Sequence, residues 1–273
     1  MKRLAIILIL MLALPCWSAN DFTLDPNCLH VYNCESGALT TDSKGSLTLI
    51  PSNISADATN YKQGSAALTP TFAVNSGMYT GDGLLGADFP GKNGTTNRTL
   101  SVTYWIRHTT IAAGQHAVTK WDDPSALSWS CYMSDVAGTD RFRFLLGYNG
   151  GSSGEGYTDT STAVGVNKWY HVGMTYDGAT KGWMIRIWDD DASSVGETTG
   201  TGAQVMNCGG AGFYICNYQD MFDGILGQID EVTIFNDVLT ADQIDMIRLG
   251  TYSGTGEGGS GINDWWWRRR RNN

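Results

Sequence analysis

Short segments in which apolar and polar residues alternate fill most of the chain after residue 100. Segments of this kind, each bounded by Gly, Asn, Asp or Ser, lie at 100–108, 116–121, 127–133, 141–148, 169–176, 182–188, 212–217 and 224–235. Within 182–188, Trp183, Ile185 and Ile187 occupy every second position, the spacing of a half-buried strand. Many short strands with regular turn signals predict an all-β fold, a two-sheet antiparallel β-sandwich of the jelly-roll kind.

One segment near the C-terminus has a helical pattern instead. Thr240 and Gln243 have the spacing of a capping box, in which each side chain meets a backbone donor of the other residue. Ile244 and Ile247 then form a short apolar stripe, and Gly250 ends it. The pattern predicts one short C-terminal helix and a single domain over residues 19–250. Residues 251–273 are predicted to be a Gly/Ser linker followed by a tail rich in Trp and Arg.

The N-terminus has the features of a secretory signal peptide. Lys2 and Arg3 precede an unbroken apolar run over residues 4–14, and small residues follow it. The run is too short for a membrane span, which needs about 20 apolar residues. Residues 1–18 are therefore predicted to be a signal peptide cleaved after Ser18. The expected location is secreted, periplasmic or at the cell surface, and the short exported chain suggests a bacterial source.

Charge is distributed unevenly along the sequence. The whole chain has a net charge of −9, and between residues 19 and 262 there are 26 acidic but only 12 basic residues. An acidic body argues against nucleic acid as a partner of the folded domain. The tail at 263–273 reverses the balance, with three consecutive Trp followed by four consecutive Arg. This composition predicts contact with a membrane or another anionic envelope surface, and the alternative is a disordered tail without a specific function.

Five cysteines remain after the predicted signal peptide, and in an exported protein we expect them to be mostly oxidised. Short spacing favours two disulfides, Cys28–Cys34 and Cys208–Cys216, and leaves Cys131 over. Five cysteines allow several connectivities, so spacing alone does not settle the pairing. Zinc binding is the alternative, but the sequence has no C-x-x-C pair with a nearby histidine.

Several motifs together resemble the laminin-G-like, concanavalin A-like jelly-roll domains. The stretch GQIDEVTIFN at 227–236, followed by VLTADQI at 238–244, resembles the closing motif of that family, and WYHV at 169–172 leads into YDG at 176–178 as in its members. LSVTYWI at 100–106, QGSAAL at 63–68 and DSKG at 42–45 resemble earlier family segments. The resemblance runs from about Leu29 to Leu249 and implies the same fold. The cysteines are not general features of the family.

The resemblance also implies a metal. Related jelly rolls often hold a structural calcium between an acidic N-terminal loop and the closing strand, and calcium prefers several oxygen ligands. The matching residues here are Glu35, Asp42 and Asp230. The alternative is that these carboxylates stabilise turns and a sheet edge.

Catalysis is not expected. Glycosidases need two carboxylates flanking the scissile bond, and the related hydrolases take them from one strand in an E-x-D-x-x-E pattern that does not occur here. Asp230 and Glu231 are consecutive, so on a regular strand they point to opposite faces. The expected protein is therefore a non-catalytic module.

Aromatic residues outside the predicted core suggest carbohydrate binding, because flat rings stack on the C–H faces of sugars. Trp105 and Trp169 fall at core positions of the resemblance. The candidate ligand-binding residues lie at strand ends, on predicted polar faces or in loops: Trp121, Trp129, Tyr148, Tyr157, Trp188 and Tyr218. The leading hypothesis is a carbohydrate-binding or adhesion module whose partner is a glycan or cell-surface polymer. The alternatives are a structural or protein-interaction domain of the cell envelope, and a divergent glycosidase.

Overall fold

The computed structural model describes residues 20–72, 74–112, 114–122, 126–136, 138–148, 153–155, 163–218 and 223–254. The predicted signal peptide, the tail at 263–273 and Tyr157 lie outside these residues. Within the described part, no helix is long and apolar enough to cross a membrane.

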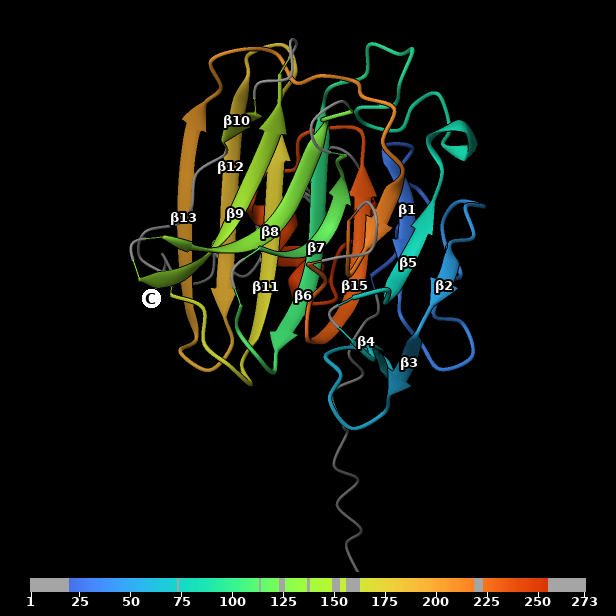
Figure 1. Ribbon diagram of the computed structural model, residues 1–273, viewed down its shortest axis with the longest axis vertical. Coiled ribbons are helices and arrows are strands. Elements are labelled where there is room, and N and C mark those ends of the chain that lie inside the picture. Colours follow the sequence, from blue (N-terminus) through green and yellow to red (C-terminus); the bar gives the residue numbers. More distant parts are fainter. Residues whose placement is uncertain are drawn as a thin grey trace, which may run out of the picture.

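Two antiparallel sheets pack face to face (Figure 1). The eight-stranded sheet, called sheet A, has the order β13-β12-β11-β6-β15-β4-β3, with β1 also paired to β15. Its strands are β1 Cys28–Tyr32, β3 Ile54–Asp57, β4 Ala67–Pro70, β6 Leu100–His108, β11 Trp169–Tyr176, β12 Gly182–Asp189, β13 Ser194–Thr201 and β15 Gly227–Phe235.

The seven-stranded sheet, called sheet B, has the order β10-β9-β8-β7-β14-β5-β2. Its strands are β2 Ile50–Ser52, β5 Gly77–Thr80, β7 Gln115–Lys120, β8 Trp129–Val136, β9 Thr139–Gly147, β10 Ser153–Glu155 and β14 Phe213–Ile215. A 3₁₀ turn, η1, spans Asp82–Leu84, and the one α-helix of the described residues, α1, spans Ala241–Arg248. The predicted β-sandwich with a short C-terminal helix is confirmed.

Alternation along the strands builds the core between the sheets. In β12, Trp183, Ile185 and Ile187 are buried while the residues between them are partly exposed, as the sequence predicts. All eight predicted strands match observed ones, and β6 and β11 match at both ends. The very short strands β2, β3, β5 and β10 and the polar edge strand β13 were not predicted, because they carry too few apolar residues to show a period. Strand β1 was not predicted either, because its apolar residues do not alternate with polar ones.

The outer face of sheet A is covered by α1 and by the two ends of the domain. The predicted capping box between Thr240 and Gln243 is present at the start of α1. The helix lies on β11 at Gly173, where an added Cβ would come within 2.7 Å of Ile244 Cγ2. Phe22 and Tyr252 complete a second apolar cluster on this face. Because Tyr252 is buried, the packed domain extends beyond the predicted boundary at residue 250.

The two predicted disulfides do not form in the structure, where all five described cysteines are free thiols. Cys28 belongs to the cluster on the outer face of sheet A, whereas Cys34 lies in the core between the sheets. Cys216 is likewise a core residue, while Cys208 is partly exposed and its Sγ lies 3.7 Å from the carbonyl oxygen of Asn97. Close spacing in sequence therefore misled the prediction, because the members of each pair lie in different environments.

Candidate functional site

The outer face of sheet B carries a row of partly exposed tyrosines. Tyr79 on β5 and Tyr214 on β14 are directly paired in register, and their rings stack with centroids 6.0 Å apart. Tyr214 is in register with Thr119 of β7, which is in turn in register with Ser130 of β8. The two tyrosines therefore continue a row across four neighbouring strands in which Thr119 and Ser130 are buried.

A second group of rings stands next to this row. His116 of β7 is sandwiched between Tyr132, at 5.1 Å, and Tyr218, at 4.6 Å between ring centroids. The His116 Nδ1 atom lies 2.7 Å from Ser130 Oγ, and burial lowers the pKa of the ring to about 4. His116 is therefore neutral at pH 7. Arg143 Nη1 donates to the Tyr132 hydroxyl at 3.1 Å.

We call Tyr79, Tyr132, Tyr214, Tyr218 and His116 the tyrosine face. Its four tyrosines are partly exposed and each carries a hydroxyl at its edge, while His116 is 7% exposed and packs between two of them. Such a surface can stack on an apolar ligand face and also exchange hydrogen bonds with ligand hydroxyls. Of the predicted ligand-binding residues, Tyr218 is part of it.

Three other predicted ligand-binding aromatics are buried, so those assignments are wrong. Trp129 is fully buried against Phe89, and its Nε1 donates to the carbonyl oxygen of Pro90 at 3.0 Å. Tyr148 is a member of the core cluster, and Trp121 is 5% exposed. Buried rings cannot form a binding surface.

Trp188 is partly exposed but lies on the other side of the molecule, on the outer face of sheet A. The guanidinium carbon of Arg248 sits 4.0 Å from the centre of its ring, and its Nε1 donates to Asp190 at 3.2 Å. One face of the Trp188 ring is therefore covered by a cation of the protein itself. The structure does not bring Trp188 together with Tyr218.

Sequence reasoning missed Tyr79, Tyr132, Tyr214 and His116. The signal for Tyr132 was present, because Trp129, Cys131 and Met133 share one phase of the alternation and Tyr132 has the other. The more apolar phase faces the core, so the same argument that exposes Tyr132 buries Trp129.

The three carboxylates predicted to bind calcium do not form a ligand set. Both oxygens of Asp42 already accept hydrogen bonds, from the backbone N–H groups of Val31, Lys44, Gly45 and Leu47, and Asp42 Oδ2 lies 2.7 Å from Nδ1 of His30. Because N–H donors occupy the positions where a cation would stand, Asp42 does not fit a calcium site. It caps a turn, which was the alternative interpretation.

Asp230 and Glu35 also accept hydrogen bonds from backbone N–H groups. Asp230 accepts from the backbone N–H groups of Lys62, Gln63 and Glu231, while Glu35 accepts from both the N–H and the hydroxyl of Ser65. Across the described residues, no three His, Cys, Asp or Glu side chains are grouped so that they could hold a metal ion. These carboxylates thus anchor the segment that leads into β4.

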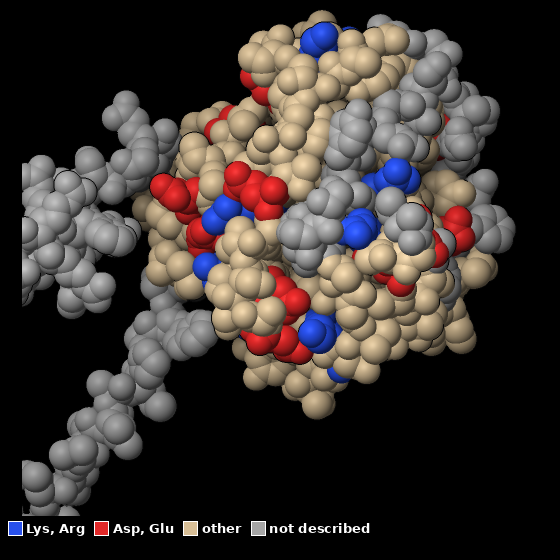
Figure 2. Space-filling model, turned by 90° about the vertical axis from the view of Figure 1, so that its left-hand side faces the viewer, with Lys and Arg blue, Asp and Glu red and all other residues tan. Residues whose placement is uncertain are grey.

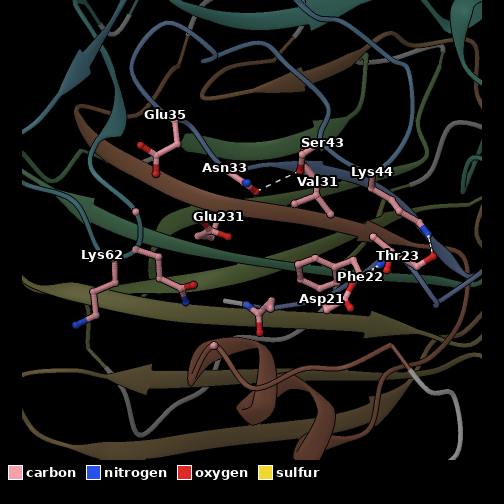
Figure 3. Close-up of a pocket in the computed structure, with 14 residues that line it drawn as sticks. Asp21, Phe22, Thr23, Val31, Asn33, Glu35, Ser43, Lys44, Lys62 and Glu231 are labelled. Carbon is pink, nitrogen blue, oxygen red and sulfur yellow. Dashed lines mark hydrogen bonds between the residues drawn. The ribbon is translucent and has the colours of Figure 1, made fainter. Parts of the chain in front are cut away.

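A cavity of about 640 Å³ opens beside this segment, on the outer side of sheet A. We call it the N-terminal pocket. Figure 3 shows Glu231 at its centre, with Glu35 and Lys62 on one side and Phe22 and Thr23 on the other. The lining comes from segments that are far apart in the sequence.

Glu231 reaches the pocket because β15 contains a bulge. The pairing of β15 with β6 shifts register between Asp230 and Thr233, and Glu231 has a positive φ of 51°. Regular alternation is lost there, so the expectation that Asp230 and Glu231 point to opposite faces is wrong. Burial, and then the neighbouring charges of Asp230 and Glu35, raise the pKa of Glu231 to about 8. Burial also raises the pKa of Asp230, to about 7.

Charged side chains elsewhere form small mixed groups. On the side of the molecule in Figure 2, acidic side chains gather beside single basic ones, and the residues coloured there form no continuous basic patch. Arg186 illustrates the pattern, since it pairs with Glu197 at 2.5 Å and with Asp245 at 2.6 Å.

Two packed antiparallel sheets, one of them covered on its outer face by α1, define a jelly-roll domain. The family model of the concanavalin A-like lectin/glucanases superfamily matches residues 82–245, so the chain belongs to that superfamily. No curated protein matches the sequence.

Solved structures with this fold include domain 4 of AbnA, a GH43 extracellular arabinanase from Geobacillus stearothermophilus, in complex with arabinotriose. It has a TM-score of 0.56 and 18% identity, and the match covers 82% of this chain and 98% of that domain. The binding domain of Paraclostridial Mosquitocidal Protein 1 has a TM-score of 0.55 and 15% identity, covering 81% of this chain and 52% of that one. The receptor binding domain of botulinum neurotoxin type G has a TM-score of 0.53 and 14% identity, and the match covers 81% of this chain and 51% of that one. At these identities the matches show the shared fold, and this chain spans about half the length of the two toxin domains.

Proposed function

We propose that the protein is a non-catalytic carbohydrate-binding module and that its glycan lies across the tyrosine face. The observation that carries this proposal is the arrangement of Tyr79, Tyr214, Tyr132 and Tyr218 around neighbouring strands of sheet B. Sugar rings stack on aromatic faces, and the tyrosine hydroxyls can hydrogen-bond sugar hydroxyls.

The two sheets differ in how accessible their outer faces are, and this supports the choice of sheet B. The outer face of sheet A is covered by α1 and by the cluster that includes Phe22, Phe235 and Tyr252. Two of its large aromatic side chains are not available to a ligand, since Trp105 is 2% exposed and the guanidinium group of Arg248 covers one face of Trp188. Sheet A therefore offers no comparable set of rings.

The comparisons support the proposal at the level of fold. A domain of the same architecture has been solved with arabinotriose, a short oligosaccharide. The apolar run near the N-terminus supports export, which would place such a module at the cell surface, in the periplasm or outside the cell. An extracellular or envelope polysaccharide is then the expected ligand class.

Affinity measurements on tyrosine variants test the proposal. The full chain is screened on a glycan array, and the dissociation constant for the best ligand is measured by calorimetry. Tyr214→Ala is expected to weaken binding about 5-fold or more, which corresponds to about 1 kcal/mol for the loss of a contacting aromatic side chain. Tyr61→Ala is the matched control, because Tyr61 is an exposed tyrosine outside the tyrosine face.

Two results would reject the proposal. Equal affinity of Tyr214→Ala, Tyr61→Ala and the unmodified protein would remove the tyrosine face from glycan binding. Release of shorter sugars from the bound oligosaccharide would contradict the non-catalytic assignment.

A further inference from the structure

Two cysteines from distant parts of the chain lie in the same core between the sheets. Cys34 comes two residues after the end of β1 in sheet A, and Cys216 directly follows β14 in sheet B. Both are 0% exposed and belong to one core cluster. The structure thus separates Cys34 from Cys28 and Cys216 from Cys208, the partners that sequence spacing favoured, and buries the two remaining members of those pairs together.

The segments that carry these two thiols face each other across the sandwich. The rings of Tyr32 at the end of β1 and Phe213 at the start of β14 have their centroids 6.5 Å apart. Cys34 follows Tyr32 by two residues, and Cys216 follows Phe213 by three. The two cysteines therefore come directly after a pair of aromatic side chains that meet in the core.

Both segments then lead toward the connection between β4 and β5. In sheet A, the backbone N–H of Leu68 on β4 interacts with the Cys34 thiol. In sheet B, the carbonyl carbon of Cys216 lies 3.5 Å from the position that a Cβ would take on Gly77, the first residue of β5. The thiols also interact with each other, since a charge on Cys216 raises the pKa of Cys34. These contacts make the two thiols neighbours.

The backbone at both cysteines is in the left-handed region. The φ angle is 57° at Cys34 and 67° at Cys216. This conformation favours glycine, and a residue with a Cβ is strained there. Because both positions carry cysteine despite this strain, and because the two thiols are neighbours, the thiol side chains themselves are the feature that the two positions share.

We propose that Cys34 and Cys216 form a disulfide in the exported protein and that this bond joins the two sheets through the core. Export, which the apolar N-terminal run supports, supplies an oxidising compartment. The bond forms by exchange with a disulfide donor: one cysteine thiolate attacks the donor, and the second thiolate displaces it from the mixed disulfide. Two cysteine thiols become one disulfide, while the donor takes up two electrons and two protons and becomes two thiols.

Burial determines when the exchange takes place. In the folded structure both residues are thiols, and burial raises the thiol pKa of Cys34 and of Cys216 well above the ordinary value. A buried thiol with a raised pKa is a poor nucleophile. The disulfide therefore forms while the chain is folding, before the two sheets close over the cysteines, and the closed core then protects it from reductants.

The bond holds a segment that carries part of the tyrosine face. Tyr214 lies two residues before Cys216, and Tyr218 lies two residues after it. A disulfide restricts the unfolded chain more strongly as the enclosed loop grows, and this loop includes most of the domain. The consequence for ligand binding rests on the proposed function, whereas the disulfide itself does not depend on the glycan site.

The test is a disulfide map of the full chain. The protein is unfolded, refolded in a mixture of oxidised and reduced glutathione, alkylated and digested without reduction, and the linked peptides are identified by mass spectrometry. The main cross-link is expected to join Cys34 to Cys216. Alkylation of these residues as free thiols in most molecules, or a main cross-link between any other two cysteines, would overturn the proposal.

Variants connect the bond with stability. Reduction before heating is expected to lower the melting temperature of the refolded protein by about 4–16 °C. Cys216→Ala should lose both the cross-link and this response to reductant. Cys131→Ala is the matched control and should keep both, because Cys131 is another fully buried core cysteine, on β8.

Two further outcomes keep the inference distinct. Equal responses to reductant in Cys216→Ala and Cys131→Ala would show that the proposed bond is absent. Tyr214→Ala should retain the cross-link, so failure of the tyrosine face and failure of the disulfide give different results. The map of the unmodified protein decides the pairing even if a cysteine variant does not fold.

Discussion

Docking of α1 on sheet A depends on the absence of a side chain at Gly173. A Cβ atom added there would lie 2.7 Å from Cγ2 and 2.9 Å from Cδ1 of Ile244, and real Cβ contacts are essentially never that short. Ile244 is 1% exposed, so it has no free space into which to retreat. Gly173→Ala is therefore expected to push α1 away from β11.

The size of the effect can be estimated from overpacking. Inserting a methyl group into a packed site costs about 1–3 kcal/mol. A domain of this size loses about 2–4 °C of melting temperature per kcal/mol, so Gly173→Ala should lower the melting temperature by about 2–12 °C. Without the clash, Gly→Ala in a strand would instead stabilise the protein by about 0.5–1 kcal/mol. The sign of the change is therefore informative.

A double-mutant cycle with Ile244→Ala tests whether the contact is the cause. Ile244→Ala alone should cost about 2–5 kcal/mol, as for other buried large-to-small changes. In that background the clashing atoms are gone, so Gly173→Ala should then be neutral or stabilising. Urea unfolding of the four proteins gives the coupling free energy. If Gly173→Ala has the same cost in both backgrounds, the proposed contact between Gly173 and Ile244 is wrong.

Three further predictions follow from the site residues. Because the pKa values of Asp230 and Glu231 are raised to about 7 and 8, the stability that they contribute is complete below about pH 4 and is lost as the pH rises to 8. Between pH 5 and pH 8.5, the free energy of unfolding in urea should therefore decrease less for Glu231→Gln than for the unmodified protein. An equal decrease in the two proteins would contradict this prediction. Calcium should not change the melting temperature relative to EDTA, because backbone N–H groups occupy the candidate carboxylates; a rise that saturates with calcium concentration would show a site. Native alkylation followed by mass spectrometry should modify the partly exposed Cys208 before the buried Cys34 and Cys131, whose thiol pKa values are raised by burial; the reverse order would refute their burial.

Local patterns in the sequence were enough to predict the architecture. Alternation located the long strands, and the Thr240–Gln243 capping box located α1, because both signals depend on residues that are close in sequence. Strands such as β5 and β10 contain only three or four residues, so no local period reveals them.

The binding residues were harder to predict because they depend on the phase of each strand. Trp129 was assigned to a group of residues at strand ends or on polar faces, whereas Cys131 and Met133, which share its phase, face the core. The position of Glu231 at the pocket depends on a β-bulge, which cannot be recognised from a single sequence. The N-terminal pocket joins the N-terminal segment, the loop after β1, the segment before β4 and β15, and only the folded chain brings these together.

The most direct test of the account is to locate a bound oligosaccharide on the protein. The ligand selected by the glycan array is titrated into the isotope-labelled full chain, and the amide signals that shift are mapped onto the structure. The account predicts shifts centred on Tyr79, Tyr132 and Tyr214 of sheet B, which are lost in Tyr214→Ala. Shifts centred on sheet A around α1, with the signals of sheet B unchanged, would contradict it.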